Sequence, residues 1–378
     1  MASEQKKKFN EKHELRRRIF KATKAEKTNW RKVKADLSKS KEYKLLKEKE
    51  QLEKDSEQKN DVVDKSRPYS LSIAVPGQFL NNAQSSELRA YMVGQVARAA
   101  TLFCVEEIVI YDESCRMTQE AIDSYWNGSW RGNTETSDSN YESCFHLAKI
   151  LEYLECPQYL RKALFPIHKA LRYAGLLNPL DAQHHLKSDD RSFFFREGIV
   201  LKKPVKQGRG PICDIGLEKE FQIESEIPLP PGTRVTVEIK NMDEDAKRYR
   251  GSLSSAAKVR QKTGQYWGYS VRIVTSLQET IDRSKYLTVA GVSPRGIPIG
   301  QFDVCVLNKP KILLVFGGIS GVDAAVESEE LAEWKRAEDA FDVLLATTAS
   351  NGSRSERVEE NVLAVLAQVQ CRLEQLSM

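Results

Sequence analysis

The chain lacks several patterns that would assign it to a function class at once. None of its seven cysteines stands in a CxxC pair, which argues against a zinc ribbon or a dithiol redox site and favours reduced thiols. No segment approaches the roughly 20 consecutive apolar residues of a membrane helix, and no Gly-Lys-Ser/Thr loop offers a nucleotide triphosphate site. We therefore expect no bound metal and no membrane partner.

Positive charge is what the sequence does have, and it is unevenly placed. Residues 1–66 hold 21 Lys and Arg against 13 Asp and Glu, a net charge of +8, in a chain of net charge +5. Residues 196–274 carry +5, whereas 67–195 and 275–378 together carry −8. Any affinity for nucleic acid should therefore come from the N-terminal extension or from 196–274.

The N-terminal extension, 1–66, is low in complexity and rich in Lys, Glu and Arg. It is expected to be partly disordered or helical, because its leucines are too sparse for a strong apolar face. A solvated segment is one interpretation, and an electrostatic arm for RNA or a nuclear-import signal is the other. The two interpretations are compatible.

The segment 67–195 begins with an apolar run over 69–75, an amphipathic helical pattern and a second apolar run over 105–111. This order predicts a βαβ unit, and hence a parallel sheet. Ser85 or Ser86 is placed to cap the helix. Its expected apolar stripe consists of Leu88, Met92, Val96 and Ala99. Polar residues then predict a loop over 112–140.

The pattern changes near residue 196. Short β runs bounded by Gly or Pro follow one another through 196–274, which predicts a small barrel. We assign the run "GQYWGYSVRIV" to this barrel as a further strand. Strands alternate with helices again over 275–378. The most economical organisation is one α/β domain interrupted by the barrel.

Three late strands end in small or turn-forming residues: "SPRG" at 293–296, "GGISG" at 317–321 and "NGSRS" at 351–355. Loops at the carboxyl ends of parallel strands meet in one crevice, and glycines let backbone groups reach a ligand directly. Together, three such loops can enclose a ligand the size of adenosine. A purely structural turn at Gly317-Gly318 is the alternative.

In combination, a set of motifs resembles the SPOUT class of RNA methyltransferases, over roughly 67–370. The motifs are "VPGQFLNNAQSSELRAYMVGQVARA", "LEYLECPQYLRKALFP", "AGLLNPLDAQHH", "REGIV", "YWGYSVR", "VFGGISG" and "NGSRSERVEE". The sequence is most similar to the eukaryotic–archaeal branch, which carries an inserted OB-like barrel and includes a centromere-associated vertebrate member. This resemblance implies an α/β trefoil-knot domain with a parallel sheet.

The resemblance also implies a cofactor, S-adenosyl-L-methionine, and a pocket built from the three loops. The first loop would contribute Ser293 and Gly296 beside Arg295. The third loop, which the knot would thread and which we call the threaded loop, would contribute Ser353 among its members. The full implied set is Ser293, Gly296, Gly317, Gly318, Ile319, Thr348, Asn351, Gly352 and Ser353. Pro294 stiffens the first loop, which departs from the family pattern.

Related enzymes often use an arginine from the first βα segment, which makes Arg89 the first candidate for catalysis. The alternative is a surface helix residue. Arg295 and Arg354 are the next candidates, and His184-His185 is either a site pair or an ordinary loop pair. On the barrel, RNA contact is expected from Lys202, Lys203, Lys206, Arg209, Trp267 and Tyr269, with packing in the barrel core as the alternative for the aromatic rings.

Two function hypotheses follow from the resemblance. The first is an S-adenosylmethionine-dependent methyltransferase that acts as a homodimer on structured RNA, with ribosomal RNA and a base nitrogen such as uridine N3 as the suggested target. The second is an RNA-binding or scaffold protein of the mitotic spindle or kinetochore that retains the fold. The implied localisation is nuclear and cytoplasmic, with spindle, centrosome or kinetochore in mitosis.

Overall fold

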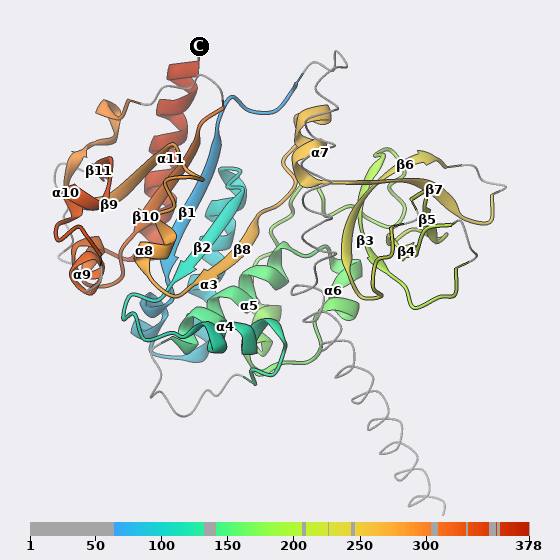
Figure 1. Ribbon diagram of the computed structural model, residues 1–378, viewed down its shortest axis with the longest axis horizontal. Helices are drawn as coiled ribbons and strands as arrows, with labels where there is room; N and C mark the ends of the chain where they lie inside the picture. The colour runs from blue at the N-terminus through green and yellow to red at the C-terminus, as the bar shows by residue number, and fades with distance from the viewer. Residues whose placement is uncertain are drawn as a thin grey trace, which may run out of the picture.

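The computed structural model contains two bodies, a parallel sheet flanked by helices and a small barrel beside it (Figure 1). It describes residues 64–131, 141–205, 209–225, 227–242, 246–303, 309–329, 332–347, 353 and 356–377. Within these ranges no helix is both long and apolar enough to cross a membrane. The predicted α/β domain with a barrel insertion is confirmed.

The sheet of the described chain has six parallel strands in the order β11–β9–β10–β1–β2–β8. Its central strands are almost entirely apolar, as expected for a parallel sheet that is covered on both faces. β1 pairs in parallel with β2, which confirms the predicted βαβ unit. The strands are β1 (Ser70–Pro76), β2 (Glu107–Tyr111), β8 (Ser270–Val274), β9 (Thr288–Pro298), β10 (Lys311–Phe316) and β11 (Val343–Ala346).

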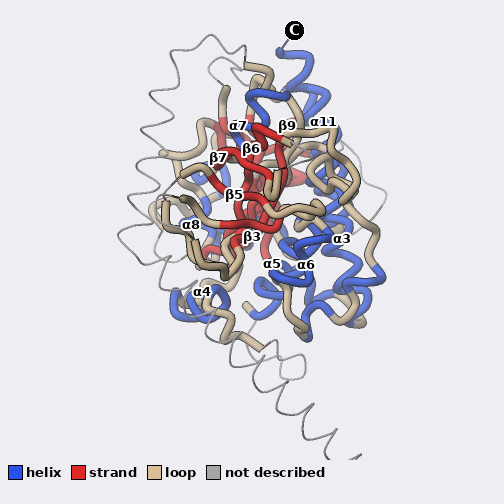
Figure 2. Tube along the Cα trace, turned by 90° about the vertical axis from the view of Figure 1, so that its right-hand side faces the viewer, coloured by secondary structure: helices blue, strands red, loops and turns tan. Residues whose placement is uncertain are grey.

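Helices cover both faces of the sheet. On one face lie α3 (Ser86–Leu102), α5 (Glu142–Glu155) and α11 (Val358–Ser377). On the other lie the short α8 (Leu277–Thr280), α9 (Gly321–Glu327) and α10 (Ala337–Ala340). Figure 2, turned by 90°, shows α3 and α5 on the opposite side of the strands from α8.

Of two expectations about α3, one is confirmed and the other is wrong in part. Ser85 caps α3 as predicted, because its side chain accepts a hydrogen bond from the N–H of Leu88. Leu88 itself was wrongly placed in the apolar stripe: it is 49% exposed, whereas Met92, Val96 and Ala99 are buried. The first turn of α3 extends beyond the core, so its apolar residue faces outward.

The predicted loop over 112–140 is wrong in part. The structure has a helix there, α4 (Gln119–Trp126), whose Thr118 cap accepts from the N–H of Ala121. Ile122 and Tyr125 bury its inner face. The polar composition hid this helix, because an eight-residue helix needs few apolar residues. Pro157 separates α5 from α6 (Gln158–Leu164).

The barrel closes through five strands in the order β3–β4–β5–β7–β6. Its strands are β3 (Phe195–Val200), β4 (Ile212–Asp214), β5 (Phe221–Ile223), β6 (Arg234–Asn241) and β7 (Tyr249–Ser254). Phe221, Val237 and Tyr249 are among the residues of its core. The barrel strands therefore end at Ser254.

The strand β8 was assigned to the barrel, and that assignment is wrong. Its residues pair in parallel with β2, for example Arg272 with Val109. After the barrel the chain forms α7 (Ala256–Thr263) and returns along 264–269 to the edge of the sheet. A short apolar run bounded by glycine looks the same in either sheet, so the sequence pattern alone could not decide between them.

A buried ionic network joins the barrel to the sheet domain, and we call it the domain joint: Glu155, His184, Glu197, Arg234, Thr236 and Trp267. Arg234 of β6 donates to both carboxylate oxygens of Glu155, at 2.5 and 3.0 Å. Its Nε also donates to Glu197 at 2.8 Å. One barrel guanidinium thus connects a strand of its own sheet to the last residue of α5.

The other side chains of the domain joint complete the hydrogen bonds of the two carboxylates. Thr236 and the indole of Trp267 donate to Glu197 Oε1, at 2.6 and 2.7 Å. His184 Nε2 lies 3.0 Å from the carboxylate of Glu155. Burial alone would raise the pKa of Glu155, but Arg234 and His184 hold that pKa well below its usual range. The carboxylate therefore stays charged inside the joint.

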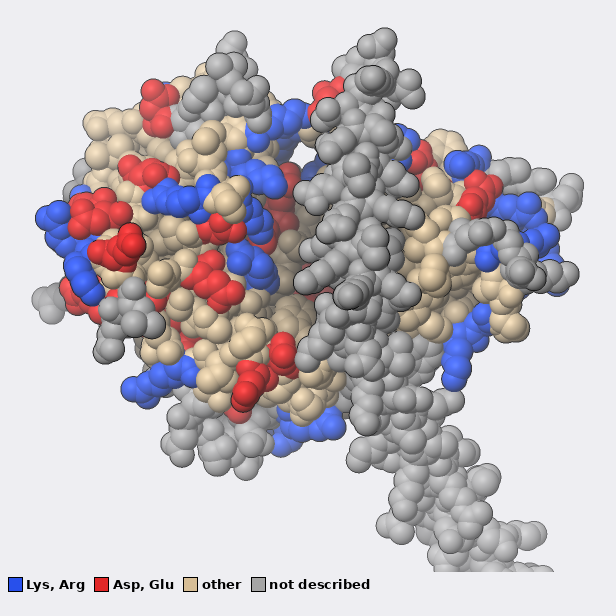
Figure 3. Space-filling view, in the orientation of Figure 1, with Lys and Arg blue, Asp and Glu red and all other residues tan. Residues whose placement is uncertain are grey.

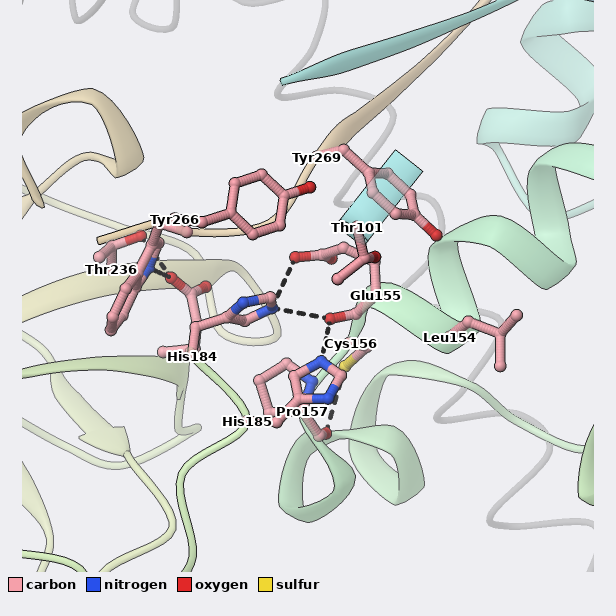
Figure 4. A network of polar contacts seen from close by, with 12 residues as sticks. Thr101, Leu154, Glu155, Cys156, Pro157, His184, His185, Thr236, Tyr266 and Tyr269 are labelled. Carbon is pink, nitrogen blue, oxygen red and sulfur yellow. Dashed lines mark hydrogen bonds and ion pairs between the residues drawn. The ribbon is translucent and has the colours of Figure 1, made fainter. Parts of the chain in front are cut away.

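His184 and His185 are structural residues. Figure 4 shows both rings directed at the end of α5, where each Nε2 donates to the backbone carbonyl of Glu155, at 2.9 and 2.8 Å. Burial and the neighbouring His184 lower the pKa of His185 to about 4. The pair bonds the carbonyl at the end of α5, so the interpretation as an ordinary loop pair is the better one.

Gly268 is required at the domain joint. A Cβ there would lie 2.4 Å from Glu155 Oε1, and the backbone has a φ of +71°. Gly268→Ala should lower the free energy of unfolding by about 1–3 kcal/mol, because strain and a displaced carboxylate add together. Urea unfolding followed by tryptophan fluorescence measures the loss.

Gly175→Ala is the matched control, since a Cβ at Gly175 would meet nothing within 4 Å. Equal losses in the two variants would show that the joint does not depend on the close approach at Gly268.

Candidate functional site

The carboxyl ends of the central strands meet at one edge of the sheet. β9 pairs with β10 up to Val292 and Phe316, so Ser293 and Gly317 follow at neighbouring positions. β2 ends nearby, and the Tyr111 hydroxyl donates to the carbonyl of Phe316 at 2.7 Å. The structure therefore brings together the first two of the three predicted loops.

The first loop is an excursion within β9. β11 pairs Leu344 with Gly291 and then Leu345 with Ile297, so residues 292–296 bulge out of the ladder. Gly296 permits the return, because a Cβ there would lie 2.5 Å from the backbone of Leu344 and Leu345. The glycine is thus needed for strand packing.

The second loop is a tight turn from Gly317 to Gly321. The N–H of Gly321 donates to the carbonyl of Gly318 at 3.1 Å, and Gly321 has a φ of +82°. A Cβ at Gly317 would lie 2.0 Å from the backbone nitrogen of Val322. Ile319, at the tip, is 63% exposed. The geometry of the turn alone explains why glycine stands at 317 and 321, which favours the alternative of a purely structural turn for Gly317.

Gly318 differs from these two glycines, because its neighbour is a carboxylate. Its N–H donates to Glu113 Oε1 at 2.8 Å. A Cβ at Gly318 would lie 2.3 Å from Glu113 Oε2. Burial raises the pKa of Glu113, and the charge of Asp112 adds to the increase while the Gly318 N–H opposes it. Sequence reasoning missed Glu113, although its place directly after a buried strand was a usable signal.

Asp112 fixes the loop that carries Glu113. It is fully buried. Its Oδ2 accepts from the backbone N–H groups of Arg116 and Met117, at 2.8 and 2.7 Å, and its Oδ1 accepts from the N–H of Ser114 at 3.0 Å. These bonds hold the loop rigid against the sheet edge. The position of Glu113 is therefore set by backbone capping.

Arg295 lies at the rim of the same edge. Its guanidinium pairs with Asp323 in the first turn of α9, and its side chain is 62% exposed. Ser293 Oγ accepts the N–H of Arg295 at 3.3 Å and donates to Asp323 at 3.4 Å. An exposed ion pair is weak, so Arg295 can exchange Asp323 for a substrate group at little cost.

Most of the threaded loop lies outside the described residues, including Thr348, Asn351, Gly352 and Arg354. Ser353 is described and is exposed. Arg89 lies on the first turn of α3 and is half-buried, and its Nε is enclosed without a hydrogen-bond partner. The structure thus places Arg89 partly inside the protein.

Three of the basic residues predicted to contact RNA are exposed on the barrel. Lys202, Lys203 and Arg209 are exposed, and Lys203 pairs with Glu220. Lys206 lies outside the described residues. Figure 3 shows Lys and Arg side chains at the outer end of the barrel, whereas acidic and basic side chains mix over the visible face of the sheet domain.

The expected aromatic platform on the barrel is wrong. Trp267 and Tyr269 are 3% and 6% exposed, so neither ring has a face on which a base could stack. Trp267 donates to Glu197 in the domain joint, and the Tyr269 hydroxyl donates to the carbonyl of Leu151 at 3.0 Å. The two rings lie before β8, on either side of Gly268, and pack in different hydrophobic clusters.

A family model described as "Putative RNA methyltransferase" matches residues 70–369. The chain belongs to this family. It is 65% identical to "Putative methyltransferase spot-1" of Caenorhabditis elegans over 379 residues, which is 100% of both chains. It is 42% identical to the "28S rRNA (uridine-N(3))-methyltransferase" of Mus musculus, over 82% of this chain and 78% of the mouse protein. The prediction of an RNA methyltransferase is confirmed.

Among solved structures, the match with the SpoU methyltransferase AviRb from Streptomyces viridochromogenes, which was solved with its cofactor AdoMet, has a TM-score of 0.29 at 8% identity. It covers 83% of this chain and 61% of that one. A TrmH-family protein from Porphyromonas gingivalis also gives a TM-score of 0.29, with coverage of 80% and 60%. These superpositions are too loose to argue from.

The contact between Gly318 and Glu113 generates a test of the cofactor pocket. Gly318→Val would displace the Glu113 carboxylate and reshape the turn. We expect the affinity for S-adenosylmethionine to fall by at least about tenfold, equivalent to about 1.4 kcal/mol, with little change in melting temperature. Isothermal calorimetry measures the affinity.

Gly300→Ala is the matched control, because a Cβ at Gly300 would lie in open space. Unchanged affinity in a folded Gly318→Val protein would exclude this turn from the pocket.

Proposed function

We propose that the protein transfers the methyl group of S-adenosylmethionine to N3 of a uridine in large-subunit ribosomal RNA. The observation that supports the target is the activity for which the mouse relative is named, since the chain aligns with that protein over 82% of its own length. The human and Drosophila melanogaster relatives carry the same name, at 41% and 40% identity. A shared target is the simplest explanation of this similarity.

The described loops fit the nucleoside part of such a cofactor. Gly296, Gly317 and Gly318 let the backbone of the two loops pack closely at the sheet edge, and Ile297 and Ile319 are 40% and 63% exposed beside them. Apolar side chains on either side of a glycine backbone suit a flat purine that is held by main-chain hydrogen bonds. S-adenosylmethionine supplies a methyl group on a sulfonium, ready for in-line displacement. The chain's own task is to hold the two reacting atoms in line.

Charge on the protein supports a division of labour between the bodies. RNA phosphates should bind electrostatically to the exposed Lys202, Lys203 and Arg209 on the barrel and to the basic extension 1–66. The pocket stands at the sheet edge. Arg89, Arg295 and Arg354 are the candidates for stabilising charge on the target base as its proton leaves.

The exposed apolar residues of α3 support a homodimer. Leu88 and Tyr91 are 49% and 50% exposed near the start of the helix, and an apolar surface of this kind suits a second copy of the chain. For localisation, we propose nucleus and cytoplasm, with a mitotic pool at the spindle or kinetochore. The support for this is the sequence resemblance described above.

Methyl mapping tests the reaction. Purified protein incubated with S-adenosylmethionine and ribosomal RNA lacking the modification should produce N3-methyluridine at one position, detected by reverse-transcription stops and by mass spectrometry of nucleosides. Methylation of a ribose or of another base would replace the proposed target. No transfer to any RNA by a protein that binds the cofactor would favour a scaffold role.

The barrel generates a second test. Replacing Lys202, Lys203 and Arg209 together by Ala should weaken RNA binding by about 10- to 100-fold at low salt, and the loss should shrink as salt rises. The affinity for S-adenosylmethionine should not change, because the pocket stands on the other body. Filter binding at several salt concentrations, with calorimetry alongside, measures both.

A triple variant of exposed cations on the sheet domain, Lys311, Lys335 and Arg336 to Ala, removes the same charge elsewhere. If this variant loses as much RNA affinity, the barrel is not the RNA platform.

A further inference from the structure

Three polar nitrogens beside the sheet edge are buried and have no hydrogen-bond partner. They are Arg89 Nε on α3, Trp130 Nε1 in the segment after α4, and His146 Nε2 on α5. A buried polar atom without a partner is costly, and native proteins leave few of them. Three in one region leave hydrogen-bonding capacity that a ligand could use.

The three residues form one cluster. The rings of Trp130 and His146 lie 5.2 Å apart at 85°, and the charge of Arg89 acts directly on His146. His168 holds Trp130 from the other side, with ring centroids 4.8 Å apart and its Nε2 donating to the carbonyl of Trp130 at 3.3 Å. Three chain segments therefore converge on the same small volume.

The cluster stands next to the candidate active site. The N-terminal turn of α5 packs against the end of β1 so closely that a Cβ at Gly77 would lie 2.5 Å from Cys144. The thiol of Cys144 in turn contacts the carbonyl of Tyr111, at the end of β2. Glu113 and Gly318 follow along that edge. The helix that carries His146 thus reaches the same edge of the sheet as the methyl donor's proposed pocket.

The chemistry of the three nitrogens is directional. The Nε–H of Arg89 and the indole N–H of Trp130 can only donate. Burial, followed by the charges of Arg89 and His168, lowers the pKa of His146 to about 4, so its ring is neutral at neutral pH. In the Nδ1–H tautomer its Nε2 accepts. The cluster then offers two donors and one acceptor.

This set complements the edge of one base. Uracil presents two carbonyl oxygens, which accept, on either side of an N3–H, which donates. Cytosine presents an amino group and an unprotonated N3 in two of these positions, so it leaves the donors and the acceptor mismatched. A site built from buried hydrogen-bonding groups rejects the analogue that leaves them unpaired.

We propose that Arg89, Trp130 and His146 form the pocket of the target uracil, with His146 Nε2 facing N3. The proposal rests on the proposed uridine methylation. Trp130 and Arg89 donate to the two carbonyl oxygens and fix the ring. Both residues are half-buried, so the base enters past their side chains.

His146 then has a defined part in the reaction. N3 forms its bond to the methyl carbon while the methyl–sulfur bond breaks, which makes the N3–H strongly acidic. The weakly basic Nε2 of His146 then takes this proton, and the electron pair of the N–H bond stays on N3. The positive charge of the sulfonium thus ends on the protonated imidazole. Arg89 stabilises the uracil oxygens while N3 loses its proton.

Binding of nucleotides to the full chain tests the pocket without any turnover. The chain holds five histidines, so single substitutions assign every imidazole signal in an NMR spectrum of labelled protein. With S-adenosylhomocysteine present, uridine 5′-monophosphate should shift the His146 signal in a saturable way. Cytidine 5′-monophosphate and inorganic phosphate should not. An equal shift with phosphate alone would overturn the base pocket.

Kinetics on the methylated RNA test the roles separately. Trp130→Phe keeps the ring and removes one donor, so it should raise KM about threefold to tenfold. His146→Ala should lower kcat by about 10²- to 10⁴-fold, and His146→Gln, which holds a polar group in place, should restore nucleotide binding but not kcat. Trp126→Phe, the same change on a 37% exposed neighbour, should change neither.

The outcomes separate the pocket from the proposed function. If uridine monophosphate shifts His146 but no RNA is methylated at uridine, the pocket stands and the proposed function fails. If uridine is methylated at the normal rate by folded His146→Ala protein, the pocket is overturned and the function stands.

Discussion

The contact of Arg234 with Glu155 and Glu197 is the interaction on which the arrangement of the two bodies depends. Neither carboxylate could be buried alone, because an unpaired buried charge costs several kcal/mol. Groups from three separate segments satisfy the two carboxylates: the guanidinium from β6, the indole from the segment before β8, and an imidazole from the loop before β3. The barrel is therefore held at one orientation, and its basic outer end stands at a fixed distance from the sheet edge.

Much of this architecture could be predicted from the sequence, because apolar periodicity reports burial directly. The parallel sheet, the cap at Ser85 and the interruption by a barrel followed from that pattern. The position of β8 could not be predicted, since a short apolar run after a glycine carries no information about which strand it pairs with. Trp267 and Tyr269 show the same limit: residue type suggested base stacking, and three-dimensional packing placed both rings inside.

The candidate site shows where sequence reasoning succeeds and where it stops. Glycines after two of the three apolar runs, at Gly296 and Gly317, marked the sheet edge correctly, because close backbone approach leaves a compositional trace. Glu113 left only its position after a buried strand, since its importance arises from one hydrogen bond to Gly318 across 205 residues of chain. The sequence singled out Arg89 but not Trp130 or His146, because the cluster is defined by hydrogen bonds that are missing. Only coordinates reveal a polar atom without a partner.

The strand order has a consequence for folding while the chain is being synthesised. β1 lies between β2 and β10, but β10 begins at Lys311, more than 230 residues after β1 ends. At about 5–20 residues per second, a ribosome needs roughly 10–50 s to deliver it. During that time one edge of the apolar strand β1 is unpaired, and an unpaired strand edge can associate with other chains. The barrel closes within this interval. A protein proposed to modify the ribosome therefore depends, during its own synthesis on a ribosome, on a factor that covers this edge of β1.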